Sequence, residues 1–109
     1  MASILLALTS APETPAGRRA LGLAESLSGL GHALTLCCLQ DSVVLASTRA
    51  PDGARAALGR LLDRGAGCLV LGEDLTLRGL EPAARASAVD YGAMVAALAA
   101  GHDRVLGAF

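Results

Sequence analysis

Two adjacent carboxylates, Glu73 and Asp74, follow a short apolar run and precede an arginine-glycine pair at Arg78. Carboxylates and a guanidinium at the end of a buried strand can bind a small polar ligand or form ion pairs with a neighbouring chain. The same residues can equally serve the fold, because the helix dipole stabilises negative charge in the first turn of a helix. Two interpretations follow: a working site, or a strand that passes into a short helix.

Two other strand ends are expected to bring polar side chains to the same place. Thr9 and Ser10 follow the first apolar run, and Gln40 and Asp41 follow the second. The carboxyl ends of parallel strands lie at one edge of a sheet, where ligands bind in open α/β folds. Helix capping is the alternative role for Asp41. The candidate ligand or interface residues are Thr9, Ser10, Gln40, Asp41, Glu73, Asp74 and Arg78.

The three cysteines are the candidate nucleophiles. Cys37 and Cys38 are adjacent in an apolar run, so in a strand their side chains point to opposite faces of the sheet. Helices are expected on both faces, which predicts that both thiols are buried and unreactive. A reactive thiol must be exposed and lie near positive charge, and Cys38, nearer to the strand end, is the better of two weak catalytic candidates. Cys68 begins the third run, at the edge away from the candidate site.

The sequence contains no recognisable motif for binding a metal ion or a cofactor. His32 and His102 have no metal-ligand spacing with any cysteine, so no metal site is predicted. The loop at residues 9–17, TSAPETPAG, joins a strand to a helix, but it lacks GxGxxG and GxxxxGK[ST], and its prolines have no N–H to donate. Flavin binding normally needs aromatic side chains, and the only ones are Tyr91 and Phe109. No cofactor is therefore predicted.

Apolar runs alternate with amphipathic helical stretches along the chain. This alternation predicts an α/β fold in which helices cover both faces of a parallel sheet. Thr14 and Asp90 are the predicted N-caps of the first and last helices. Residues 42–48 are ambiguous because their valines suggest a strand, and we favour a short helix capped by Asp41. Strands are predicted at residues 3–8, 32–39, 68–71, 88–89 and 104–106, and helices at 15–30, 54–64, 73–77 and 91–100.

Length and composition restrict the class of protein. The 109 residues predict one domain, spanning residues 1–109. The net charge is −1 and the arginines form no run, which argues against direct nucleic-acid binding. The longest uncharged stretch, residues 26–40, is too short to span a membrane, and we interpret the N-terminus as a strand, not a signal peptide.

Cysteine content and hydrophobicity predict the setting and the partners. Three cysteines do not make a disulfide framework, so a reduced, cytoplasmic location is expected. The hydrophobic fraction is 53% and the chain carries little charge. Such a chain is expected to leave apolar surface uncovered, which predicts self-association or a partner chain.

Three ordered blocks resemble the DsrE/DsrF/DsrH sulfur-relay family. They are LTLCCLQDSVVLA from residue 34, GCLVLGEDLTLRGL from residue 67 and VDYGAMVAALAAGHDRVLGAF from residue 89. The closest subgroup is the DsrH or TusB-like subunit, whereas GRRALGLAESLSGLGHALTL in the first third resembles the DsrE or TusD type. The resemblance covers nearly the whole chain. The shared features are Gln40-Asp41, Glu73-Asp74, Arg78-Gly79 and Asp90-Tyr91.

The resemblance implies a flavodoxin-like, three-layer αβα fold in the cytoplasm. It also implies assembly as a homo-oligomer, or as a hetero-oligomer with sister DsrE- or DsrF-like chains. In such assemblies persulfide sulfur passes between a donor and an acceptor protein, toward thiolation of the tRNA wobble uridine or toward sulfur oxidation.

Neither cysteine position known from this family is filled here. Catalytic DsrE-type members carry a sulfur-accepting cysteine a few residues before the Arg-Gly pair, and the equivalent position is about Leu71. Some DsrH-type subunits carry a cysteine in the first helix, and residues 15–30 contain none. We therefore expect a non-catalytic or atypical subunit that acts through assembly. Glu73 and Arg78 are expected to pair with each other or with a neighbouring chain.

Two alternatives remain, so whether the chain is an enzyme stays open. One is a sulfurtransferase that uses Cys38 as a displaced nucleophile. The other is a small-ligand binding module at the carboxyl edge of the sheet.

Overall fold

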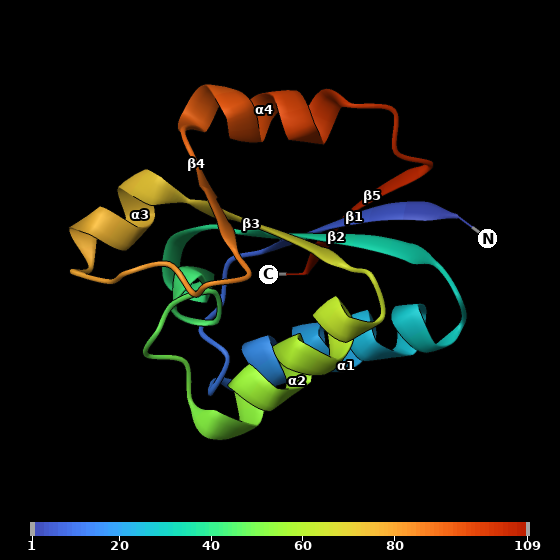
Figure 1. Ribbon diagram of the computed structural model, residues 1–109. Coiled ribbons are helices and arrows are strands. Elements are labelled where there is room, and N and C mark those ends of the chain that lie inside the picture. The colour runs from blue at the N-terminus through green and yellow to red at the C-terminus, as the bar shows by residue number, and fades with distance from the viewer. Residues whose placement is uncertain (1, 109) are drawn as a thin grey trace.

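The chain folds around a five-stranded parallel sheet with the strand order β4-β3-β2-β1-β5 (Figure 1). The computed structural model describes residues 2–108. The predicted α/β class is confirmed, as one compact domain with helices on both faces of the sheet. The strands are β1 (Ser3–Leu8), β2 (Ala33–Cys38), β3 (Gly67–Leu71), β4 (Ser87–Val89) and β5 (Arg104–Ala108); the helices are α1 (Pro15–Gly29), the 3-10 helix η1 (Gln40–Val44), α2 (Asp52–Asp63), α3 (Gly72–Leu77) and α4 (Tyr91–Ala99).

The two faces of the sheet are covered unequally. Helices α1 and α2 pack side by side on one face, whereas α4 lies alone on the other (Figure 1). Right-handed crossovers explain this arrangement. The chain steps from β1 to β2 to β3 in one direction, which puts α1 and α2 on the same face. The step from β4 to β5 runs the other way and puts α4 on the opposite face.

Alternating side chains along the buried strands divide the core in two. Leu6 and Leu36 are fully buried and belong to the larger cluster, which packs against α1 and α2. Leu5, one residue away, belongs to the smaller cluster under α4. The buried members of that smaller cluster are Leu5, Cys37, Leu71 and Met94. The face under α4 therefore has much the smaller core.

Helix α1 begins where the sequence predicts. The Thr14 Oγ1 accepts the N–H of Gly17 at 3.0 Å, and Pro15 is the first helical residue. Gly17 also lies directly on the preceding loop, because a Cβ at this position would be 1.9 Å from the carbonyl oxygen of Ala11. Only glycine allows this approach of helix to loop.

The segment after β2 is helical, as we favoured, but the predicted capping by Asp41 is wrong. The N–H of Leu39 donates to the Oγ of Ser42 at 2.8 Å, and the Ser42 hydroxyl donates to the carbonyl of Leu8 at 2.6 Å. Ser42 is 1% exposed, so a buried serine anchors η1 to the end of β1. The carboxylate of Asp41 lies at the surface instead.

Other differences from the predicted elements are small. The predicted N-cap Asp90 is confirmed, because its Oδ1 accepts the N–H of Ala93 at 2.7 Å. Helix α2 begins at Asp52 instead of residue 54, β2 spans Ala33–Cys38 instead of residues 32–39, and β5 continues to Ala108.

The close approach at Gly17 predicts a large difference between two glycines of α1. Gly17→Ala is expected to lower the free energy of unfolding by about 1–3 kcal/mol, because the new methyl group must displace the loop backbone. Gly22→Ala, at a position with nothing within 4 Å, is expected to raise it by about 0.5–1 kcal/mol. Urea denaturation of both variants measures the difference, and equal effects at the two positions would contradict this packing.

Candidate functional site

Helices η1 and α3 meet at the carboxyl edge of the sheet, where four of the predicted site residues come together. The Oδ2 of Asp74 accepts the backbone N–H of Gln40 at 2.6 Å. Arg78 donates from Nη1 to the carbonyl of Asp74 at 3.2 Å and from Nη2 to the Oδ1 of Asp41 at 2.9 Å. Arg78 thus joins the two short helices. Asp74, which belongs to α3, also links them, because its side chain accepts the N–H of Gln40 in η1.

Gln40 adopts a left-handed backbone conformation with φ at 53°. It is the one non-glycine residue with positive φ in residues 2–108, and the sequence carries no signal for it. Such a conformation costs about 1–2 kcal/mol for a residue with a Cβ. The charge-assisted bond from its N–H to Asp74 offsets part of this cost.

The expected pair of Glu73 and Arg78 does not form within the chain. Arg78 instead contacts Asp74, four residues earlier, and Asp41 on η1. In a helix, residues four apart share a face whereas residues five apart do not. This spacing explains why Arg78 contacts Asp74 and not Glu73. Both acidic residues nevertheless lie in the first turn of α3, as expected.

The two predicted hydroxyl groups stay outside this network. Thr9 and Ser10 are half-buried after the end of β1. Neither makes a side-chain hydrogen bond within the described residues. Four of the seven candidates therefore form one connected cluster at this edge, and Thr9, Ser10 and Glu73 lie outside it.

Most charged groups of the cluster are already bonded to other groups of the same chain. The Asp74 side chain is 17% exposed and already accepts an N–H, and Arg78 is held by two partners. The Asp41 side chain is 70% exposed and contributes surface charge. The arrangement therefore acts as a structural junction, with the exposed carboxylate of Asp41 at its rim.

The cysteines lie in the core, on the faces that the sequence predicts. Cys37 belongs to the cluster under α4 and Cys38 to the cluster under α1 and α2, and both are fully buried. Burial, with a smaller contribution from Cys68, raises the pKa of Cys37 to about 11. A hydrogen bond to Cys68, together with burial, raises the pKa of Cys38 well above its ordinary value. Neither thiol is a thiolate near neutral pH.

Cys68 lies closer to Cys38 than its position in the sequence suggests. The register of the sheet pairs Cys68 with Leu36, two residues before Cys38, so both thiols point to the same face. The hydrogen bond from Cys38 lowers the pKa of Cys68. Cys68 is only 4% exposed, however, so solvent does not reach it.

The two histidines hold the start of β1. The Nδ1 of His32 accepts the N–H of Ala2 at 3.1 Å, and the Nδ1 of His102 lies 3.0 Å from the Oγ of Ser3. Within residues 2–108, no three His, Cys, Asp or Glu side chains are grouped so that they could hold a metal ion. No helix in the same part of the chain has the length and apolar character needed to cross a membrane.

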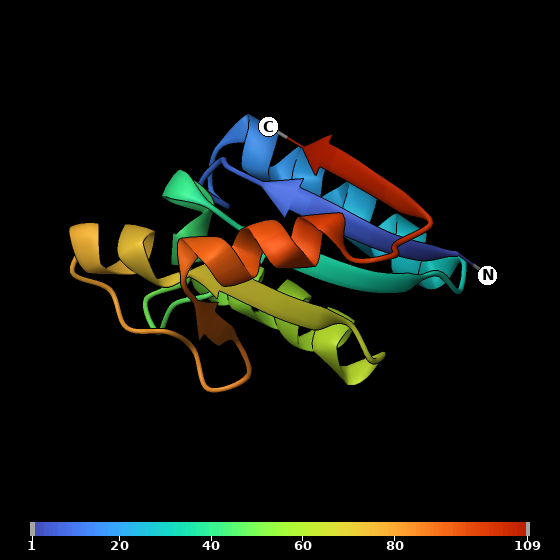
Figure 2. The same cartoon turned by 90° about the horizontal axis from the view of Figure 1, so that it is seen from above.

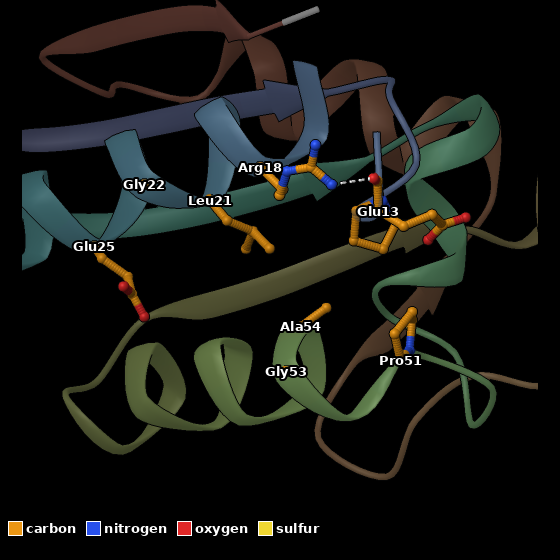
Figure 3. A pocket seen from close by; sticks show the side chains of 9 residues that line it. Glu13, Arg18, Leu21, Gly22, Glu25, Pro51, Gly53 and Ala54 are labelled. Atoms are coloured by element: carbon orange, nitrogen blue, oxygen red, sulfur yellow. Dashed lines mark hydrogen bonds between the residues drawn. The ribbon is translucent and has the colours of Figure 1, made fainter. Parts of the chain in front are cut away.

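A surface pocket of about 390 Å³ lies between α1 and α2 (Figure 3), and no residue of the strand-end cluster lines it. Two of its charged side chains already have protein partners: Arg18 donates to the carbonyl of Glu13, and Glu25 accepts from Arg60 at 2.7 Å. The sequence did not predict this pocket, because its walls come from distant segments that share no motif. Its lining residues are Pro12, Glu13, Arg18, Leu21, Gly22, Glu25, Pro51, Gly53 and Ala54.

Comparison with known proteins gives a structural match. No protein-family model matches this chain, and no curated protein matches it by sequence. Its structure is similar to the crystal structure of the ychN protein from E. coli, with a TM-score of 0.82 and 19% sequence identity. The match covers 98% of this chain and 99% of that chain. At this identity, the likeness shows the fold alone.

The two carboxylates bonded to Arg78 are expected to differ in their energetic contribution. Asp74→Ala should lower the free energy of unfolding by about 1.5–3 kcal/mol, because it removes a charged hydrogen bond to the strained Gln40. Asp41→Ala should change it by less than about 1 kcal/mol, because its ion pair is exposed. Chemical denaturation of the two variants tests this, and a loss at Asp41 equal to that at Asp74 would contradict it.

The raised pKa of Cys37 predicts loss of stability at alkaline pH. The ordinary value of the thiol is 9.0 and the folded value is about 11, so the folded state holds the proton more tightly. The resulting stabilisation is complete below pH 9 and is lost as the pH rises toward 11. The free energy of unfolding, measured in reductant across this window, should fall less steeply for Cys37→Ala than for the natural sequence. Identical slopes would show that Cys37 does not carry this dependence.

Proposed function

We propose that this chain is a sulfur-relay-type subunit that acts through assembly and does not itself carry sulfur on a thiol. Its partners would be further copies or sister chains of the same fold, and its pathway would be protein-to-protein sulfur transfer toward tRNA thiolation or sulfur oxidation. A reducing, cytoplasmic setting is part of this proposal, and it fits the three free cysteines.

The burial of every thiol is the observation that carries the proposal. A sulfur acceptor must be a thiolate that a donor protein can reach. Cys37 and Cys38 are 0% exposed and Cys68 is 4% exposed. The position that resembles the family's acceptor site holds Leu71, which is itself only 5% exposed. Neither the residue type nor the access needed for transfer is present at that position.

The carboxyl edge supports a role in assembly more than a role in ligand binding. Ligands in open parallel sheets bind where neighbouring strands send their connections to opposite sides. Here the connections after β1, β2 and β3 all step in the same direction, so these strand ends form no such crevice. Three carboxylates lie at this edge, those of Asp41, Glu73 and Asp74, whereas Arg78 pairs with only two of them, Asp41 and Asp74. A negatively charged surface of this kind suits contact with another subunit.

The proposal predicts slow modification of all three native thiols. Timed alkylation at neutral pH, read by intact mass, should label them on the order of 100-fold more slowly than an exposed thiol, because each must wait for local opening. The matched control is Leu30→Cys, which places a thiol at a position that is 75% exposed.

A second readout tests sulfur acceptance directly. After treatment with a polysulfide, the natural sequence should show no added sulfur mass, whereas Leu30→Cys should gain sulfur on its new thiol. If a native cysteine labels as fast as that control and gains sulfur, the chain is a sulfurtransferase and the proposed function is wrong.

A further inference from the structure

Helix α4 is apolar on every side, yet most of it is exposed. Its sequence, YGAMVAALA, contains no charged residue. Met94 is 2% exposed, whereas Tyr91 and Val95 are 62% and 49% exposed. A helix that is apolar all round is normally buried all round. The folded chain alone does not provide that cover for α4.

The sheet face under α4 is also incompletely covered. Five strands spaced about 4.8 Å apart place the outer two about 19 Å from each other, whereas one helix with its side chains is about 10 Å wide. Seen from above, α4 does not overlie β5 (Figure 2). Val105, which pairs with the inward-facing Leu5 and so lies on the α4 side of β5, is 50% exposed. The opposite face has two helices, and this face has room for a second one.

We propose that a second copy of this chain covers this face, with the two α4 helices side by side in one layer between the two sheets. We call the surface formed by α4 and Val105 the α4 face. Under a two-fold axis, the α4 helix of each copy also covers the sheet of the other copy and fills the place left open beside that copy's own α4. Each sheet then has two helices on both of its faces.

The absence of charge on the α4 face favours a copy of the chain over a different partner. The sequence from residue 91 to residue 101 has no charged side chain, and neither has the sequence from residue 105 to residue 108. A charged partner would have to bury its charges here without counter-ions, which is costly. A two-fold contact places the same surface against itself, so apolar surface meets apolar surface.

The sizes of the α4 side chains are also complementary to themselves. Tyr91 and Val95 lie one turn apart and form a ridge, whereas Gly92, Ala96 and Ala99 are small residues along the same helix. The ridge of one helix can pack into the shallow row of small residues on the other, as in close helix pairs. The Tyr91 hydroxyl can stay in water at the rim of such a contact.

This inference deepens the proposed function, since both require assembly, but it adds the surface and the partner. The two can fail separately. Sulfur acceptance by a native thiol would overturn the proposed function and leave the α4 contact standing. An assembly held by another face would overturn the α4 contact and leave the proposed function standing.

The test is the mass in solution of three full-length proteins at tens of micromolar. The natural sequence should have a mass at least about twice that of one chain, which is 10.9 kDa. Val95→Glu should reduce the mass at least about twofold while circular dichroism stays unchanged, because it places an unpaired charge in the contact. The matched control Leu30→Glu changes a more exposed apolar residue, at the end of α1, and should keep the natural mass.

A single-chain mass for the natural sequence, or an unchanged mass for Val95→Glu, overturns the inference. Dissociation caused by Leu30→Glu alone would assign the contact to a different surface and would also overturn it. If Val95→Glu unfolds, hydrogen exchange of the natural protein decides instead. The amides of α4 should then gain protection on concentration while those of α2 do not, and equal behaviour of the two helices would contradict the proposal.

Discussion

The handedness of the crossovers is the constraint on which the rest of the molecule depends. Because β1 is followed by three steps in one direction and one return step, two helices gather on one face and a single helix lies on the other. The same constraint explains both the deep core beneath α1 and α2 and the sparse core beneath α4. It also explains why Cys37 and Cys38 are both buried. Adjacent residues of a strand point to opposite faces of the sheet, and because helices cover both faces, each thiol lies in a different core.

At the carboxyl edge, burial and geometry distinguish a supporting contact from a surface one. The hydrogen bond from the N–H of Gln40 to Asp74 holds a strained backbone and is partly shielded from water. Its loss therefore lowers the free energy of unfolding. The pair of Arg78 and Asp41 is shorter than many ion pairs, at 2.9 Å, but water competes with it and its net contribution is small. The contribution of this four-residue cluster to stability can thus come mainly from one hydrogen bond.

Local signals predicted most elements, because caps and periodicity act over a few residues. Thr14 and Asp90 were identified as N-caps from residue type and position alone, and the structure confirms both. What could not be predicted depends on the register between strands or on packing between distant segments. The contact of Cys38 with Cys68 follows from strand pairing, and the anchoring of η1 by Ser42 requires the end of β1 to lie beside it. The resemblance indicated the fold correctly, since fold similarity depends on the order of elements more than on side-chain identity.

The burial of Leu71 has a consequence for how a chain of this fold could gain or lose activity during evolution. Leu71 packs in the small core with Met94 of α4, so a mutation to cysteine would supply a thiol that no donor could reach. Chemistry at this position would need a second, independent change that moves the strand end or α4.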